Sequence, residues 1–386
     1  MGRKRKKMKL KSIKNLDLKG KLVILRIDIN TEIINGKVQD NPRFFEHAKT
    51  IKFLKGKKAR VVILAHQGSP NGHDFTSLEQ HSKILGKYVK IKFVNDIIGK
   101  KAINSIQNLK NGEALLLDNV RFLKEEFNPS IDNKLINILS EKADYFVQDA
   151  FSICHRNQTS VVSFPKILPS YIGLVMENEL KNIDKLKSKT KNALFILGGT
   201  KTKDLLLLLK NKTLSSGMFS LLCLMAKGYN LGKEKEILKN DIKYISVIKK
   251  YIENIITPVD LAVSVNGKRK NISVLDLPSK YPIYDIGDKT IELYKKEIAK
   301  SKAIFFKGAA GRIEEKGFEL GTKELLKSIS KSKGFSLIAG GSSASAIGRF
   351  KINKKGFSYI SLSGGALVHY LAGEKLPGLE ALKINL

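Results

Sequence analysis

The chain has few cysteines and no long apolar run. Only Cys154 and Cys223 occur among 386 residues, far apart and in no C-x-x-C pair, so neither a disulfide framework nor a cysteine zinc site is supported. The longest apolar stretch, residues 218–226, is much shorter than the roughly 20 residues that cross a bilayer. The basic N-terminus lacks the apolar segment of a secretory signal. These absences predict a cytoplasmic protein without a membrane span.

Acidic residues are also scarce. Lys and Arg number 70 against 36 Asp and Glu, a formal net charge of +34, and such an excess would suit a nucleic-acid binder. However, the lysines are spread through the whole sequence, and no RNA-binding signature with interleaved aromatic residues is present. The simpler interpretation is a lysine-rich solvated surface that steers anionic substrates inward. We expect no specific nucleic-acid partner.

The length exceeds what one hydrophobic core usually supports, which predicts two domains. In the first half, short and nearly continuous apolar runs are typical of strands buried on both faces. They cover residues 22–30, 59–66, 113–122 and 144–151. Stretches of helical length and period, residues 42–57 and 77–90, lie between them. This alternation of strands and helices predicts a parallel, doubly wound sheet.

The pattern starts again in the second half of the chain. Apolar runs that end in glycine clusters cover residues 193–201, 303–311, 335–346 and 357–366. Between the halves, residues 175–189 carry apolar side chains at roughly helical spacing, which indicates a connecting helix. The predicted fold class is therefore α/β, with two doubly wound parallel-sheet (Rossmann-like) domains facing across a cleft and joined by a helix.

Basic side chains follow the predicted strands of the first half. In open α/β sheets, ligands bind outside the carboxyl ends of the strands, and arginine suits bidentate contacts with phosphate or carboxylate groups. The residues at these ends are Arg26, Asp28, Asn30, Arg43, His66, Arg121, His155 and Arg156. One arginine alone would be an ordinary surface charge, whereas several on one edge predict an anion site. For Arg26, which lies within its run, an ion pair with a nearby carboxylate is an equally good interpretation.

Glycine pairs follow the predicted strands of the second half. Glycine at a strand-to-helix turn lets backbone N–H groups approach a phosphate at a helix N-terminus. The motifs are Gly198-Gly199, Gly308 with Gly311, Gly340-Gly341 and Gly364-Gly365, none with P-loop spacing. Each alone is as well explained by a tight turn, but together they predict a nucleotide site. Lys201, directly after the first pair, could place an ammonium group on a transferred phosphate.

These motifs, in this order, resemble phosphoglycerate kinases, particularly the archaeal members, from about residue 20 to the C-terminus. The segments that carry the resemblance are RIDIN, NPRF, AHQGSP, NVRF, VQDAFSICHR, LGGTK, KGAAGRIE, SGGA and LAGEKLPGLEAL. The resemblance implies phosphoryl transfer by Arg43 and Lys201 without a covalent intermediate. It implies phosphoglycerate binding by Asp28, Asn30, Arg43, His66, Arg121 and Arg156. It implies nucleotide binding by Lys201, Glu314, Gly340, Gly341, Ser342 and Ser343.

Several residues depart from the family's pattern. Ser69 stands where the family usually has a substrate-binding arginine, and Lys307 stands where an asparagine is usual. Ser342 replaces an aspartate found in many members near the metal–nucleotide complex. The second lysine of the family's lysine segment falls on Leu205. Most of the departures therefore concern the nucleotide and metal contacts.

The resemblance also implies a domain plan and a set of ligands. Residues 1–172 would bind phosphoglycerate, 173–190 would form the connecting helix, 191–366 would bind nucleotide, and 367–386 would pack back on the first domain. The expected reaction joins 1,3-bisphosphoglycerate and ADP to 3-phosphoglycerate and ATP, with Mg²⁺ held mainly by the nucleotide phosphates and no dedicated protein ligands. We expect a monomer or homodimer. The alternative is a non-catalytic module that binds phosphoglycerate and regulates.

Overall fold

The computed structural model describes residues 10–189, 193–199 and 201–383. The chain divides into two compact units. Unit 1 takes in the described residues up to Leu180 together with those from Lys375 onward, and unit 2 runs from Lys181 to Glu374. Within the described residues, no helix has the length and apolar character needed to cross a membrane.

Unit 1 contains a six-stranded parallel sheet in the order β5-β6-β4-β1-β7-β8. Its strands are β1 (Leu22–Arg26), β4 (Arg60–Leu64), β5 (Lys92–Val94), β6 (Ala114–Leu117), β7 (Tyr145–Gln148) and β8 (Ser170–Ile172). The apolar runs predicted as strands are confirmed, and each central strand is buried along almost its whole length. Burial on both faces follows from helices that cover both sides of the sheet.

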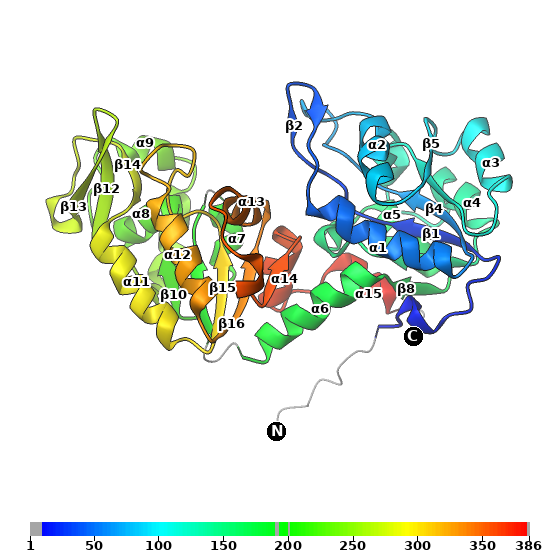
Figure 1. The fold of residues 1–386 in the computed structure, drawn as a ribbon. Helices are drawn as coiled ribbons and strands as arrows, with labels where there is room; N and C mark the ends of the chain where they lie inside the picture. The colour runs from blue at the N-terminus through cyan, green and yellow to red at the C-terminus, as the bar shows by residue number, and fades with distance from the viewer. Residues whose placement is uncertain (1–9, 190–192, 200, 384–386) are drawn as a thin grey trace. The chain divides into compact units, whose positions relative to one another are not determined.

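The sheet of unit 1 lies between two layers of the hydrophobic core, and helices pack over it (Figure 1). They are α1 (Pro42–Gly56), α2 (Glu79–Tyr88), α3 (Lys100–Gln107), α4 (Lys134–Ser140), α5 (Thr159–Val162) and α15 (Pro377–Leu382). Val23 and Leu25 belong to one layer, whereas Leu22 and Ile24 belong to the other. This alternation is what a strand between two layers of helices requires. A short hairpin, β2 (Ile33–Ile34) with β3 (Lys37–Val38), follows β1.

The C-terminal segment packs on the rest of unit 1. Helix α15 lies against α5, and the Gly378 N–H donates to the Cys154 carbonyl oxygen at 2.9 Å. A Cβ at position 378 would approach Val161 and the Cys154 Cα within about 3 Å, so glycine is needed for this close approach. Both cysteines are buried and unbridged, and burial raises the pKa of each thiol. The absence of a disulfide was predicted.

Unit 2 also contains a six-stranded parallel sheet, in the order β11-β10-β9-β15-β16-β17. Its strands are β9 (Ala193–Leu197), β10 (Thr213–Ser215), β11 (Ile255–Ile256), β15 (Ala303–Lys307), β16 (Phe335–Ala339) and β17 (Tyr359–Ser361). The helices are α7 (Thr202–Leu206), α8 (Gly217–Ala226), α9 (Glu234–Leu238), α10 (Ile245–Lys249), α11 (Asp288–Lys300), α12 (Leu320–Lys331), α13 (Gly341–Arg349) and α14 (Gly365–Leu371). The second predicted parallel sheet is confirmed.

A three-stranded antiparallel sheet, β13-β12-β14, adds to unit 2 and was not predicted. Its strands are β12 (Asp260–Val265), β13 (Lys268–Ser273) and β14 (Ile283–Ile286). Asn266 and Gly267 connect β12 to β13 with φ angles of 47° and 76°, the combination required by a two-residue hairpin turn of type I′. Asp260 fixes this sheet to α11 by accepting the Thr290 hydroxyl and the Lys289 and Thr290 N–H groups.

Helix α6 (Leu174–Lys187) lies within residues 173–190, which the sequence analysis expected to form a connecting helix and of which residue 190 lies outside the described residues. Asp149, one residue beyond the end of β7, accepts the N–H groups of Val175 and Met176 at 2.9 and 3.3 Å. A carboxylate at this helix end satisfies unpaired donors and matches the helix dipole. Asp149 is completely buried, so the start of α6 is fixed from within unit 1.

Glycine is required where β15 ends in unit 2. Gly308 has φ 97°, a conformation that other residues adopt only with strain. The Gly198 N–H donates to the Lys307 carbonyl oxygen at 2.8 Å, and a Cβ at position 308 would overlap the Gly198 carbonyl group. The ends of β9 and β15 therefore touch through backbone atoms.

Gly308→Ala should lower the free energy of unfolding of unit 2 by about 2–4 kcal/mol, because strain and steric overlap add. Gly267→Ala is the matched control, since its φ is 76° but a Cβ there meets nothing within 4 Å; it should cost about 1 kcal/mol through strain alone. Urea unfolding followed by circular dichroism measures both variants. Equal losses would show that the contact between β9 and β15 is looser than described.

Candidate functional site

Charged and polar side chains lie together at the carboxyl ends of β1, β4, β6 and β7 in unit 1, and we call this group the basic cluster. Its members are Arg26, Asp28, Asn30, Arg43, His66, Arg121 and Arg156, which hydrogen bonds, an ion pair and mutual electrostatic effects link together. These seven of the candidates predicted from strand ends in the first half are therefore brought together in one place.

Asp28 is the central carboxylate of the basic cluster. It is 3% exposed and pairs with the Arg43 guanidinium at 2.8 Å. The Ser152 hydroxyl donates to the same carboxylate, and the Asn30 N–H donates to its other oxygen at 3.1 Å. Burial alone would raise the pKa of Asp28, but the Arg43 charge and these hydrogen bonds outweigh it and hold the pKa well below its usual range. Asp28 is therefore ionised and holds Arg43 in position.

Arg26 is completely buried beneath the cluster. Its guanidinium donates to the Ser160 hydroxyl at 2.8 Å, to the Ile27 carbonyl at 2.6 Å and to His66 Nδ1 at 3.2 Å. Burial lowers the pKa of Arg26, and the nearby Glu126 carboxylate opposes that shift. The carboxylate whose charge acts most strongly on Arg26 is therefore Glu126, and Arg26 also hydrogen-bonds to His66, another member of the cluster.

His66 is a neutral imidazole. Burial lowers its pKa well below 6.5, and the neighbouring charges of Arg26, Arg121 and Arg156 act in the same direction. Because Arg26 donates to Nδ1, the proton of the neutral ring lies on Nε2. His66 can therefore donate one hydrogen bond to a ligand.

Arg121 is held above the loop that follows β4. It donates to the Gly68 carbonyl, to the Ser69 hydroxyl at 3.3 Å and to Gln158 Oε1 at 3.4 Å. Burial and the charges of Arg156 and Arg26 lower the pKa of Arg121 to about 10. Within the described part of the chain, its buried Nε has no hydrogen-bond partner. An anion bound here would relieve the repulsion among the arginines.

Sequence reasoning missed four polar residues that complete the cluster. Ser152 donates to Asp28, Gln158 accepts from Arg121, and the Ser160 N–H and hydroxyl donate to Glu126 at 2.9 and 2.7 Å. Glu126 is completely buried, and burial raises its pKa. None of the four stood out in the sequence, because serine, glutamine and glutamate are common on ordinary surfaces.

In unit 2, the turns after β9, β15 and β16 form what we call the glycine edge, comprising Gly198-Gly199, Gly308 and Gly340-Gly341. The strands are adjacent, with Lys307 in register with Leu197 and with Ala339. The Gly308 N–H donates to the Ser343 hydroxyl at 3.2 Å in the first turn of α13. Lys201 is exposed just before α7, and Gly341 and Ser342 are exposed at the start of α13. These candidates lie around one sheet edge.

Glu314 is separate from this group. It is exposed in the loop between β15 and α12. Within the described residues, no hydrogen bond or ion pair joins it to the glycine edge. Its proposed place at a nucleotide ribose therefore depends on the resemblance alone.

A group of three or more His, Cys, Asp or Glu side chains suited to a metal ion is absent from the described residues. Asp204 in α7 is the carboxylate whose charge reaches Lys307 at the glycine edge. Mg²⁺ usually takes one or two carboxylates together with substrate phosphates. The residues present therefore suit a magnesium ion that arrives with a nucleotide, but they do not make a protein cage.

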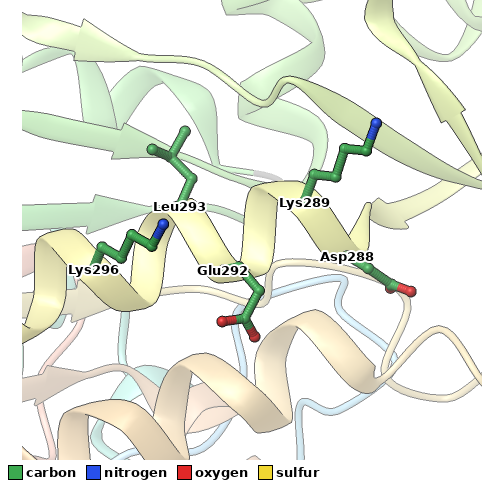
Figure 2. A pocket seen from close by; sticks show the side chains of 5 residues that line it. All are labelled: Asp288, Lys289, Glu292, Leu293 and Lys296. Atoms are coloured by element: carbon green, nitrogen blue, oxygen red, sulfur yellow. The ribbon is translucent and has the colours of Figure 1, made fainter.

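A separate open pocket of about 430 Å³ lies along α11 and is lined by Asp288, Lys289, Glu292, Leu293 and Lys296. Figure 2 shows that Glu292 projects from a different side of the helix than Leu293. Charges of both signs alternate on a single exposed helix, and no member of the basic cluster or the glycine edge takes part. The pocket carries no chemistry that the sequence predicted.

Two parallel-sheet units, one with buried arginines and the other with a glycine-lined edge, define a two-domain α/β enzyme that acts on small anions. The phosphoglycerate kinase family model matches residues 13–374. A phosphoglycerate kinase from Methanothermus fervidus is 40% identical, covering 97% of both chains, and one from Archaeoglobus fulgidus is 38% identical, covering 97% of this chain and 96% of its own.

Solved structures agree with these relatives. Phosphoglycerate kinase from Pyrococcus horikoshii superposes with a TM-score of 0.91 at 33% identity, covering 97% of this chain and 99% of that one. The enzyme from Coxiella burnetii gives a TM-score of 0.80 at 28% identity with the same coverage.

The chain belongs to the phosphoglycerate kinase family. It is an enzyme, and its function is that of a phosphoglycerate kinase. Nothing in the comparisons favours the alternative of a non-catalytic regulatory module.

The Asp28 carboxylate should make stability depend on pH. Its folded pKa lies below the unfolded value of 3.8, so its contribution is present above pH 3.8 and is lost as the pH falls below that value. Relative to Asp28→Asn, the wild type should be more stable at pH 6 by on the order of 2–3 kcal/mol, and the difference should shrink between pH 4 and pH 2.5.

Urea unfolding at several pH values measures this difference, with Asp132→Asn as the control because Asp132 is exposed. The control should match the wild type throughout. A difference between wild type and Asp28→Asn that stays constant down to pH 2.5 would contradict the ion pair between Asp28 and Arg43.

Proposed function

We propose that the chain catalyses reversible transfer of a phosphoryl group between 1,3-bisphosphoglycerate with ADP and 3-phosphoglycerate with ATP, dependent on Mg²⁺, in glycolysis and gluconeogenesis. Unit 1 is the proposed phosphoglycerate-binding domain and unit 2 the proposed nucleotide-binding domain. The observation that carries the proposal is the positive charge gathered in the basic cluster. Burial lowers the pKa of Arg26, Arg121 and His66, and the charge of Arg156 lowers all three further.

Phosphoglycerate suits this cluster because it carries a phosphate at one end and a carboxylate at the other. Arginine binds both groups through paired N–H donors. In our proposal Arg121 and Arg156 bind the non-transferred phosphate, His66 Nε2–H donates to the ligand, and Asp28 and Asn30 fix the remaining polar groups. The unpartnered Arg121 Nε is one donor that the ligand would satisfy.

Arg43 and Lys201 are the proposed catalytic residues. Phosphoryl transfer needs little covalent chemistry from the protein, since catalysis comes from positioning and from neutralising charge on the transferred group. Arg43 is partly exposed, and its Nη1 is anchored by Asp28 at 2.8 Å and by the Asn30 carbonyl at 3.0 Å. In our proposal this anchored guanidinium contacts the transferred phosphoryl group. Lys201 is exposed at the glycine edge. It would contact the transferred phosphoryl group from the side of the nucleotide.

Nucleotide binding is assigned in our proposal to the glycine edge. The N-terminus of α13 presents the backbone N–H groups of Gly341, Ser342 and Ser343 beside Gly340, and a helix N-terminus favours phosphate. Glu314 would contact the ribose hydroxyls. Mg²⁺ would be held mainly by the nucleotide phosphates, with Asp204 as the nearby carboxylate, and it would supply charge neutralisation during transfer.

The reaction is proposed to take place in the cytoplasm, by a monomer or homodimer. The free buried thiols of Cys154 and Cys223 suit a reducing compartment. Gel filtration with light scattering would distinguish monomer from homodimer.

A coupled assay for ADP formation from ATP and 3-phosphoglycerate tests the proposal directly. We expect turnover in the presence of Mg²⁺ and its loss when EDTA removes the metal. A folded sample that binds 3-phosphoglycerate but shows no turnover at any Mg²⁺ concentration would contradict the catalytic proposal.

Arg43→Ala should lower kcat by about 100-fold or more, since removal of one preorganised charge at a transition state typically has that effect. The KM for 3-phosphoglycerate should change by less than about threefold, because other arginines hold the ground state. Arg349→Ala, at the last residue of α13, controls for loss of a positive charge. An unchanged kcat in Arg43→Ala would remove Arg43 from the catalytic role.

Transfer requires the phosphoglycerate and nucleotide groups to meet in line, so we propose a hinge motion about α6 when both ligands are bound. Small-angle scattering should give a smaller radius of gyration with 3-phosphoglycerate and a non-hydrolysable ATP analogue together than with neither. Each ligand alone serves as a control. An identical radius in all samples would eliminate the proposed motion.

A further inference from the structure

Lys307, at the end of β15, is a buried lysine without a close partner. The residue is 9% exposed, whereas lysine is almost never this buried unless its charge is paired. Within the described part of the chain, no hydrogen bond and no ion pair within 4 Å involves its ammonium group. By contrast, the lysines that do form ion pairs among the described residues lie at the surface, with 27–73% of the side chain exposed.

The strand pairing places Lys307 in the middle of the glycine edge. It lies between Leu197 of β9 and Ala339 of β16 in the parallel register. Those residues directly precede Gly198-Gly199 and Gly340-Gly341. Lys307 is therefore flanked by the two turns that lead to α7 and to α13.

The charges nearest Lys307 belong to α7 and the residue before it. Burial lowers the pKa of Lys307, the Asp204 carboxylate opposes that shift, and the Lys201 ammonium adds to it. Two ammonium groups thus share one carboxylate, and a net positive charge remains at the edge. The N-terminus of α13 adds backbone N–H groups on the other side of Lys307, where an anion is favoured.

We infer that Lys307 is a further binding residue of the kinase, whose ammonium group holds the phosphate chain of the nucleotide at the β-phosphate and so favours nucleoside diphosphates and triphosphates over monophosphates. The inference rests on the proposed nucleotide site in unit 2. A phosphate chain supplies the close counter-charge that the described residues do not give Lys307. It also explains why a strand end carries a buried cation that costs stability in the free protein.

The competing explanation is structural, in which Lys307 serves unit 2 through its attraction to Asp204. The two explanations predict opposite effects of Lys307→Met, which keeps the length of the side chain and removes its charge. If the charge of Lys307 stabilises unit 2, its removal should lower the melting temperature measured without ligand. If the charge is buried without compensation, its removal should leave that melting temperature unchanged or raise it.

The experiment is isothermal titration of ADP and of AMP into wild type, Lys307→Met and the matched control Lys302→Met, whose side chain is exposed one residue before β15. We expect Lys307→Met to bind ADP at least tenfold more weakly, to bind AMP within twofold of wild type, and to melt no lower than wild type without ligand. Lys302→Met should match wild type in all three measurements. If Lys307→Met does not fold, Lys307→Gln is measured in the same way.

Three results would overturn the inference. ADP affinity unchanged in Lys307→Met would show that the ammonium group does not reach the phosphates. Equal weakening of ADP and AMP, or a lower melting temperature without ligand, would assign Lys307 a structural role. Failure of the wild type itself to bind ADP would instead overturn the proposed nucleotide site, so the two proposals fail in distinguishable ways.

Discussion

The basic cluster depends on one interaction, the ion pair between Asp28 and Arg43. Asp28 follows β1, Arg43 lies in the first turn of α1, and Ser152, which donates to Asp28, follows β7. One carboxylate thus joins three elements that are far apart in the sequence. Without the Asp28 carboxylate, Arg43 would add a further cation to a group that already contains Arg26, Arg121 and Arg156. The repulsion among these positive charges would then be less compensated.

Both units bury positive charge that the protein itself does not fully neutralise. In unit 1 the arginines lower the pKa of His66 and Arg121, and in unit 2 Lys307 is buried beside a shared carboxylate. Buried cations of this kind reduce the stability of the free protein. In the proposed function, a bound phosphate would offset this loss of stability, because it would meet charges that are already desolvated and oriented.

The sequence predicted the two parallel sheets and the residues at strand ends, because continuous apolar runs mark buried parallel strands and ligands bind at their carboxyl ends. It did not supply strand order, which decides that β1 lies between β4 and β7 and that β15 lies between β9 and β16. Contacts between neighbouring strands, such as that of Lys307 with the Gly198 turn, could therefore not be predicted from the sequence. The hairpins were missed although Asn35-Gly36 and Asn266-Gly267 have the required positive φ angles and are strong turn signals.

A buried chain of hydrogen bonds connects Asp28 to the start of α6. The Asp28 N–H donates to His47 Nε2 at 3.3 Å, His47 Nδ1 donates to Asp149 at 2.8 Å, and Asp149 accepts from Val175 and Met176. His47 thus accepts through Nε2 and donates through Nδ1, so each donor in this chain has a fixed acceptor. Displacing the start of α6 would leave buried groups unpaired, which is costly. Any motion about α6 is therefore expected to bend the helix beyond Met176 and to leave the basic cluster intact.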